Sequence, residues 1–244
     1  MATEAIKQLV DEATNIVGFS GAGISTESGI PDFRSPNGIW ATNRTVMYDE
    51  FLTRLEGRIE YWRQKAAIWP EMRVAKPNSG HFFFEKLNKA GKLKGMITQN
   101  IEGLHQASGL PADKLIEIHG TMKYVTCIDC GSRISMDEAC ERIEAGEKAP
   151  LCQECEGYLK PATISFGQSL NPKDLDQALQ WSANCDLMIA VGSSLVVQPA
   201  ASFPMVAKEN GAKLIIINRD DTPLDSVADV VIHGEIGKTL EGVI

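Results

Sequence analysis

Short apolar runs recur along this chain, and stretches with helical periodicity lie between them. The runs cover residues 16–19, 95–97, 116–118, 187–191, 214–217 and 230–232. Strands that are apolar on both faces are typical of a sheet covered by helices on both sides. Strands alternating with helices favour a parallel arrangement. The sequence therefore predicts an α/β fold with a parallel sheet and helices on both of its faces.

Small and polar residues follow five of these runs, at the point where each strand ends. They occupy positions 20–23, 98–100, 119–120, 192–194 and 218–220. Ligands bind open α/β sheets outside the carboxyl ends of the strands, so the five segments could converge on one crevice. Small polar residues also make ordinary turns, and for any single segment that explanation is equally good.

The first of these segments contains a glycine-rich turn. Gly21 and Gly23 satisfy G-x-G, but Thr26 stands where a dinucleotide fingerprint has its third glycine, and the usual acid about 20 residues on is missing. In the polar loop that follows, Arg34 and backbone amides could hold phosphates, and Phe33 could cover a flat ring. A modified Rossmann turn that binds a dinucleotide fits this pattern, and a plain strand-to-helix turn is the alternative.

Four of the six cysteines form two C-x-x-C pairs, Cys127 with Cys130 and Cys152 with Cys155. Four thiolates suit tetrahedral zinc and leave no open position, which predicts a structural metal. A redox pair or free thiols are the alternatives. The stretch 121–159 contains no long apolar run, so we interpret it as an inserted, coreless zinc module. Its loop contains a helix signal at 135–138, and the remaining Cys140 and Cys185 are interpreted as ordinary buried residues.

Charge and hydropathy narrow the class of protein. Lys and Arg number 24 against 32 Asp and Glu, for a net charge of −8, which argues against a general nucleic-acid binder. No apolar run approaches the roughly 18–20 residues of a membrane-spanning helix. Residues 1–12 are amphipathic and contain acids, unlike a signal peptide, so the expected compartment is the cytoplasm.

One histidine follows a predicted strand. The pKa of an ordinary imidazole lies near working pH, which makes His119 a candidate general base beside a nucleotide crevice. A histidine satisfied in the core is the competing explanation. His105 is interpreted in that way, within a short helix, and His81 and His233 belong to no motif.

Taken in order, these motifs resemble one family. They are G-A-G-I-S at 21–25, G-I-P-D-F-R at 29–34, T-Q-N-I at 98–101, H-G at 119–120, the two C-x-x-C pairs and G-S-S-L at 192–195. The chain resembles a sirtuin of bacterial or archaeal type, an NAD-dependent protein lysine deacylase, from about residue 13 to residue 236.

The resemblance implies a reaction and a set of site residues. The acyl group of an acyl-lysine protein or peptide passes to ADP-ribose, and nicotinamide leaves. His119 is implied as the base on the ribose hydroxyls, and Asn100 as the residue that orders water and ribose. The implied cofactor-binding residues are Gly21, Ala22, Gly23, Ile24, Thr26, Asp32, Phe33, Arg34, Trp40, Gln99, Asn100, Ile101, Glu102, Gly192, Ser193, Ser194, Asn218, Arg219, Asp220 and Ile236. The implied substrate-binding residues are Tyr61, Phe166, Gly167, Leu195 and Val196, of which the last four lie on two edges between which a peptide pairs as an extra strand.

The expected organisation follows from the motifs and the resemblance. Residues 1–35, 78–120 and 160–244 form a Rossmann-like NAD-binding domain. Residues 36–77 form a helical insert at the cofactor and acyl pocket, and 121–159 form the zinc-binding module. NAD and Zn²⁺ are the expected cofactors. The protein is expected to act as a monomer, without nucleic acid or membrane partners.

The chain departs from the family at two positions, and lacks a feature of one subgroup. Glu102 stands where the family usually has Asp, which is expected to contact the nicotinamide amide, and Gln168 replaces a common Glu in the peptide loop. The subgroup that removes succinyl groups carries Tyr and Arg three residues apart. Here Tyr61 is followed by Gln64 at that spacing, and Arg63 is one residue off. Neutral acyl groups, with acetyl first, are therefore expected.

Two other functions remain open. An ADP-ribosyltransferase on the same scaffold would transfer ADP-ribose to a protein, but loss of the catalytic histidine would be typical of it, and His119 is present. A non-catalytic NAD-binding module whose zinc ribbon docks a partner has Glu102 as its only support.

Overall fold

The computed structural model describes residues 2–32 and 38–244 and builds them around a six-stranded sheet. The strands are β1 (Ile16–Ser20), β2 (Leu93–Thr98), β3 (Leu115–Glu117), β7 (Leu187–Val191), β8 (Lys213–Ile217) and β9 (Val230–Ile232). Their order is β3-β2-β1-β7-β8-β9, and every pair is parallel. The predicted parallel sheet is confirmed, and its order reverses between β1 and β7, where such sheets bind nucleotides.

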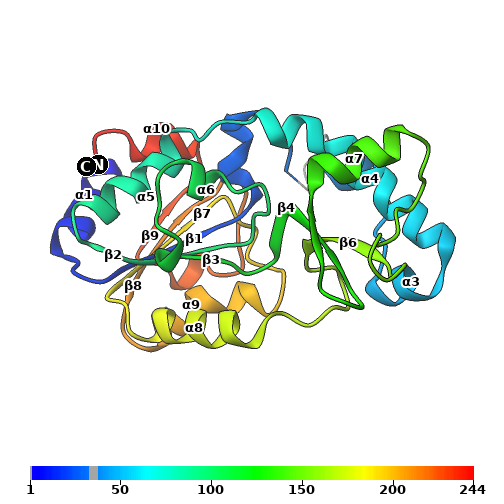
Figure 1. Cartoon of the computed structure of the whole chain (residues 1–244). Helices are drawn as coiled ribbons and strands as arrows, with labels where there is room; N and C mark the ends of the chain where they lie inside the picture. The colour runs from blue at the N-terminus through cyan, green and yellow to red at the C-terminus, as the bar shows by residue number, and fades with distance from the viewer. Residues whose placement is uncertain (1, 33–37) are drawn as a thin grey trace.

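Helices cover both faces of this sheet (Figure 1). On one face lie α1 (Ala2–Glu12), α5 (Ser79–Lys89) and α10 (Ile236–Leu240), and on the other α8 (Pro172–Ala183) and α9 (Phe203–Glu209). Phe84 of α5 and Phe203 of α9 are both fully buried, one against each face. Helix α8 begins as the sequence predicts, with the Asn171 side chain accepting from the Lys173 amide at 2.9 Å.

A second lobe lies beside the carboxyl ends of the sheet strands, at the right of Figure 1. It contains an antiparallel sheet of β5 (Arg133–Ser135), β4 (Gly120–Cys127) and β6 (Leu159–Thr163), together with α2 (Ile39–Thr42), α3 (Tyr48–Thr53), α4 (Leu55–Val74) and α7 (Met136–Glu144). The stretch 121–159 contains no long apolar run, as expected, but most of the 8-residue strand β4 falls within it. β4 buries Met122, Val125 and Cys127 with polar residues between them, so no continuous apolar run marks it.

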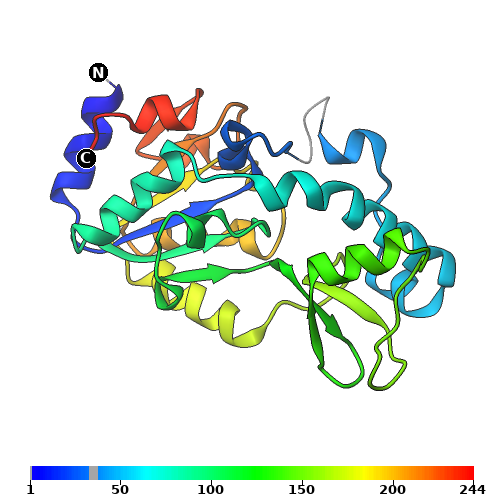
Figure 2. The same ribbon diagram turned by 45° about the horizontal axis from the view of Figure 1, so that its top comes forward.

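The zinc module has a hydrophobic core, contrary to the sequence interpretation. Trp62 and Trp69 of α4 pack in one cluster with Met122 and Val125 of β4 and with Met136 of α7. The expected helical insert and the expected zinc module therefore share their core, and Figure 2 shows α4 lying along this sheet and α7. Sequence periodicity missed this core because its two halves come from segments far apart in the chain.

The remaining elements are short turns of helix that connect strands. They are η1 (Ala22–Ser28), α6 (Leu104–Ala107), η2 (Ala112–Lys114), η3 (Ala200–Ser202) and η4 (Asp225–Val227). The two termini lie side by side on the outer end of the parallel-sheet lobe in Figures 1 and 2, away from the second lobe. Within the described ranges, every helix is too short or too polar to cross a bilayer.

Two histidines are buried together close to Ser20, the last residue of β1. The rings of His81 and His105 have centroids 4.9 Å apart, and His105 Nε2 lies 2.9 Å from the Ser20 hydroxyl. Burial lowers the pKa of His81 to about 4 and the pKa of His105 well below its usual value. His105 thus lies buried in a short helix, as the sequence interpretation has it. Of the two unmatched cysteines, Cys185 is buried and Cys140 half-buried.

We expect the folded protein to lose stability on mild acidification because these histidines resist protonation. The unfolded chain binds protons on histidine below pH 6.5, whereas folded His81 does so only near pH 4. This difference in the pKa of His81 between the folded and unfolded protein lowers the free energy of unfolding by about 2 kcal/mol between pH 7 and pH 5. Urea unfolding at the two pH values measures it. His81→Gln should flatten this dependence, and an unchanged slope in that variant would contradict the prediction.

Candidate functional site

A cavity of about 1490 Å³ lies between the two lobes, at the carboxyl ends of the parallel strands. All five segments that follow predicted strands reach it, which confirms their predicted convergence. The predicted residues that line it are Gly21, Ala22, Gly23, Thr26, Asp32, Tyr61, Gln99, Asn100, Ile101, His119, Phe166, Gly167, Gly192, Ser193, Ser194, Asn218, Arg219, Asp220 and Ile236.

Three glycines form the floor of the cavity where the strand order reverses. A Cβ at Gly21 would lie 2.7 Å from the Gly192 carbonyl oxygen, and one at Gly23 would lie 2.7 Å from the Gly192 Cα. Gly192 itself has φ 60°, and a Cβ there would lie 2.3 Å from the Ile24 amide nitrogen. The turns after β1 and β7 therefore touch backbone to backbone, which only glycine permits. This leaves a side-chain-free surface on which a dinucleotide can lie.

His119 presents one ring nitrogen to the cavity. Its Nδ1 lies 3.2 Å from the Gln99 carbonyl oxygen, which can only accept, so Nδ1 carries the proton and Nε2 keeps its lone pair. Burial lowers the pKa of His119, and the hydrogen bond to Gln99 opposes this shift. Because its pKa is lowered, the imidazole is neutral at pH 7 and available as a base. The next residue, Gly120, has φ 74°, and a Cβ there would lie 2.1 Å from the Ala162 carbonyl oxygen.

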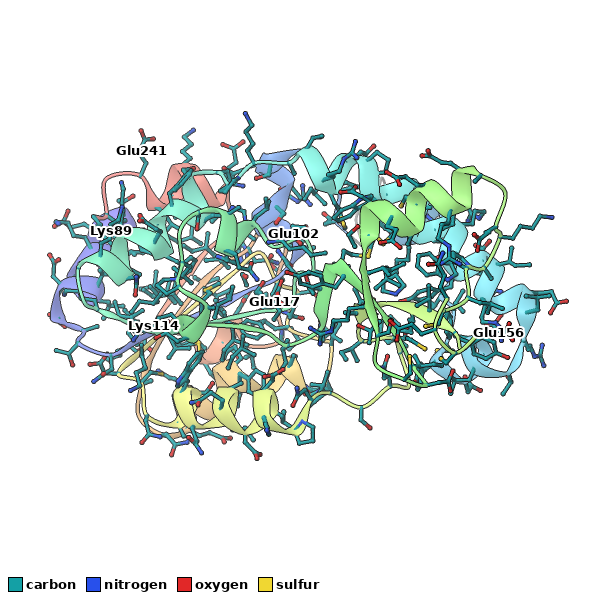
Figure 3. All side chains as sticks on the ribbon, in the orientation of Figure 1. Lys89, Glu102, Lys114, Glu117, Glu156 and Glu241 are labelled. Atoms are coloured by element: carbon teal, nitrogen blue, oxygen red, sulfur yellow. The ribbon has the colours of Figure 1, made fainter. Side chains whose placement is uncertain are left out.

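Asn100 is held by a carboxylate behind it. Its Nδ2 donates to Glu102 Oε1 at 3.1 Å and to the Ser25 hydroxyl at 3.1 Å, which leaves its Oδ1 for a ligand. Glu102 also accepts from Ser25 at 2.6 Å and from the Ile101 amide at 3.1 Å. Burial raises the pKa of Glu102, while these hydrogen bonds favour its charged form. Figure 3 places Glu102 at the junction of the two lobes.

The far end of the cavity is polar. Gln99 Nε2 donates to the Ser193 hydroxyl at 2.7 Å, which joins the ends of β2 and β7. After β8, Arg219 forms an ion pair with Asp32 at 3.0 Å, and Asn218 Nδ2 donates to the Asp220 carbonyl at 2.7 Å. Both halves of the sheet thus place polar groups along the cavity, on either side of the point where the strand order reverses.

The other end of the cavity lies against helix α4. The Tyr61 hydroxyl bonds to Thr163 Oγ1 at 2.9 Å, and Gln64 Nε2 donates to the Arg44 carbonyl at 2.9 Å. Arg63 is exposed and bonds Glu60 instead, so it does not reach the cavity. Lys65 does line the cavity, with Nζ 5.3 Å from the Tyr61 ring centroid. Burial raises the pKa of Tyr61, but the charges of Lys65 and Lys160 and the hydrogen bonds to Ser165 and Thr163 lower it to about 8.

The four predicted metal ligands come together. Sγ atoms of Cys127 and Cys155 lie 3.5 Å apart, and those of Cys130 and Cys152 lie 3.7 Å apart. Zinc–sulfur bonds of about 2.3 Å place tetrahedral ligands about 3.8 Å apart, so this donor set fits zinc. The predicted helix in the loop is α7, whose N-cap Ser135 accepts from the Glu138 amide at 3.1 Å.

Other predicted residues lie elsewhere. Ile24 is fully buried in the core, Glu102 lies behind Asn100, and Leu195 is buried, whereas Val196 is 49% exposed. Phe33 and Arg34 lie outside the described residues, and the Trp40 side chain is also undescribed.

Sequence reasoning missed part of the cavity wall. The missed residues include Ile39, Arg44, Thr45, Val46, Lys65, Ile68, Met72, Thr163, Ser165, Gly234 and Glu235. The last two follow β9, so applying the strand-end rule to the sixth strand would have found them. The α4 residues carry no motif, and only the packing of that helix brings them to the cavity.

Comparisons with known proteins agree with this geometry. Residues 21–199 match the model of the Sir2 family. An NAD-dependent protein deacetylase of Rhodopseudomonas palustris is 48% identical over 237 residues, covering 97% of this chain and 94% of that protein. A solved Sir2 complex with p53 peptide and NAD⁺ is 34% identical, with a TM-score of 0.91 over 100% of this chain and 97% of that one. A Sir2 His-to-Ala variant with deacetylated p53 peptide and 3′-O-acetyl ADP-ribose, also 34% identical, reaches 0.93 over 100% of both chains.

Proposed function

The chain belongs to the Sir2 family, and on that premise we propose the roles that its cavity residues take in catalysis. It is an NAD-dependent protein deacetylase. The observation that carries the proposed roles is the fixed tautomer of His119, whose Nδ1 faces the Gln99 carbonyl and whose Nε2 is free to accept a proton.

The cavity suits NAD. A Cβ on any of the three glycines would collide with the backbone of the opposite turn, so the turns after β1 and β7 carry no side chain at this contact. When bound, NAD supplies nicotinamide as a leaving group and a ribose that accepts the acyl group. Gln99 would hold the ribose next to the reacting carbon, and Ser193, Asn218 and Arg219 would hold the adenosine side.

His119 acts as the general base on the ribose hydroxyls. A general base must be unprotonated when it acts, and burial lowers the pKa of His119, which favours the neutral imidazole. Asn100 orders water and ribose through its Oδ1, because Glu102 and Ser25 already occupy its Nδ2. Glu102 is therefore a positioning residue, whose carboxylate is directed at Asn100 and Ser25.

The acetyl-lysine peptide enters between two exposed edges. Phe166 is 44% exposed and Val196 is 49% exposed, and we propose that the peptide pairs as a strand between the segments that carry them. The Phe166 carbonyl accepts from the Tyr48 amide at 2.9 Å, which ties this loop to α3. Gln168 stands where the family commonly has Glu, and its Oε1 accepts from the Ser165 amide at 3.1 Å. This difference from the family therefore affects the shape of the peptide loop.

Acetyl-lysine peptide is expected to exceed succinyl-lysine peptide by at least about tenfold in kcat/KM, which corresponds to about 1.4 kcal/mol. A succinyl carboxylate needs a paired cation when buried, and Gln64 offers only a neutral amide. Gln64→Arg should narrow the gap. Lys65 is the cation nearest Tyr61 in the cavity wall, so Lys65→Met should widen it. Equal turnover of both peptides by the unmodified protein would contradict the expected selectivity and would favour Lys65 as the counter-ion.

We propose that three regions of the chain have separate roles. Residues 1–35, 78–120 and 160–244 hold NAD, 36–77 close the acyl end of the cavity, and 121–159 carry zinc. A monomer is proposed as the active unit. The net charge of −8 supports a protein rather than a nucleic-acid substrate.

One assay tests the proposed activity against the two alternatives. The protein is incubated with NAD and acetyl-, butyryl- or succinyl-lysine peptide, and O-acyl-ADP-ribose and nicotinamide are quantified. We expect one nicotinamide for each acetyl group transferred, and none without acyl peptide. Nicotinamide release without acyl peptide would instead support ADP-ribosyl transfer. NAD binding without turnover would support a non-catalytic module.

A further inference from the structure

Three ionisable side chains meet outside the cavity, at the edge of the parallel sheet. His233 follows β9, Asp221 lies in the loop after β8, and Asp225 begins η4. His233 Nε2 lies 3.3 Å from Asp221 Oδ1 and 3.4 Å from Asp225 Oδ2. His119 and Asn100, to which we assign the catalytic roles, line the cavity. The proposed reaction therefore does not use this cluster.

The histidine is held in the orientation of a metal ligand. Its Nδ1 lies 3.0 Å from the Asn218 carbonyl oxygen, which can only accept, so Nδ1 carries a proton and Nε2, beside the two carboxylates, is the nitrogen available to a metal. Ligating histidines commonly donate their second nitrogen to a carbonyl in this way, because that bond fixes the ring and its tautomer.

One of the carboxylates is held as well. Asp225 Oδ1 accepts from the Thr222 hydroxyl at 2.5 Å, and Asp225 Oδ2 accepts from the Thr222 amide at 3.1 Å. Asp225 is thus fixed by a turn of its own loop and retains lone pairs on Oδ2. Asp221 is 96% exposed and can adjust to a ligand.

The two contacts fall within ion-pair distance but are long for a direct charge-assisted hydrogen bond. Charge-assisted N–H···O bonds are about 2.7–2.9 Å long, and both observed separations are clearly longer. Ligand bonds of about 2.0–2.1 Å to zinc place neighbouring tetrahedral ligands about 3.3–3.4 Å apart, which matches the two observed separations. Octahedral magnesium with bonds of similar length would bring neighbours to about 2.9 Å.

We propose that His233, Asp221 and Asp225 form a second zinc site, separate from the four cysteines. Two carboxylates and one imidazole, with water in the fourth position, complete a tetrahedral set. Calcium is disfavoured because it takes oxygen ligands, and one ligand here is a ring nitrogen. An occupied site would join the loop at 218–225 to the segment at 233, so zinc should stabilise this edge of the sheet.

The test counts zinc on the intact protein. Holoenzyme is dialysed to equilibrium against buffered micromolar to submillimolar Zn²⁺, and bound zinc is measured by elemental analysis. We expect two zinc ions per chain for the unmodified protein and one for His233→Gln and for Asp221→Asn. Glu241→Gln, an exposed acid outside the cluster, is the matched control and should bind two. The second ion should also raise the Tm of the unmodified protein and of the control, but not of the two cluster variants.

Several outcomes would overturn the proposal. They are a single zinc in the unmodified protein across the whole range, or a second zinc retained by both cluster variants. Equal binding of Mg²⁺ or Ca²⁺ in competition with Zn²⁺ would overturn the assignment of the metal. Asp221→Asn keeps the test decisive if His233→Gln fails to fold, because the Asp221 side chain is 96% exposed.

Discussion

His119→Ala is expected to lower kcat/KM for acetyl-lysine peptide by about 10²–10⁴-fold, the usual contribution of a general base. His119 is the one described histidine that lines the cavity, and its Nε2 is kept free by the contact of Nδ1 with the Gln99 carbonyl. NAD should still bind, because the glycine floor and the polar residues at the ends of β7 and β8 are untouched. Peptide turnover and calorimetric NAD binding measure the two effects.

A second readout separates a catalytic role from a structural one. The base is needed only after nicotinamide has left, so exchange of labelled nicotinamide into NAD should survive in His119→Ala better than deacetylation does. His233→Gln, at an exposed histidine outside the cavity, is the control and should keep wild-type turnover. The proposed role is wrong if His119→Ala retains more than about a tenth of wild-type turnover, well short of the loss expected for a base.

Cys152→Ala, or removal of zinc by a chelator, is expected to abolish activity and to lower the Tm substantially. Structural zinc supplies on the order of 10 kcal/mol to small modules, which is comparable with the whole net stability of a domain. Cys127 and Cys152 are buried in the core that β4 shares with α4, so loss of the metal disturbs the helix that forms the acyl end of the cavity.

The zinc prediction has a matched control in the same module. Cys140 lies on α7 but away from the four clustered thiols, so Cys140→Ala should keep zinc, Tm and activity. Limited proteolysis of the Cys152→Ala protein should cleave within 121–159 first and leave the parallel-sheet lobe protected. Active protein that contains no zinc would contradict the proposed structural role of the metal.

Much of the site could be predicted because its chemistry is local in sequence. Each C-x-x-C pair places two thiolates on one turn, so the four zinc ligands were identifiable without a fold. The residues after β1, β2, β7 and β8 were identifiable because strand ends in a parallel sheet meet at one edge. His119 needed both this rule and the family resemblance, since a lone histidine is otherwise ambiguous.

Helix α4 illustrates what the sequence could not predict. It buries Tyr61 in one cluster with Phe51, and Trp62 and Trp69 in another with β4, so its apolar residues do not follow a single stripe. Because no single face of the helix is apolar, the sequence does not indicate which parts of the protein pack against α4. The placement of Lys65 in the cavity wall follows from that packing alone.

By itself, the sequence determined the parallel sheet, the zinc ligands and the strand-end residues of the cavity, because each depends on neighbours within a few positions. Only the tertiary structure decided that the zinc module shares its core with α4, and that Glu102 turns toward Asn100. It alone also brought His233 to Asp221 and Asp225. These arrangements join segments that lie apart in the chain or depend on the burial around them, and such contacts are fixed by packing, which no local pattern encodes.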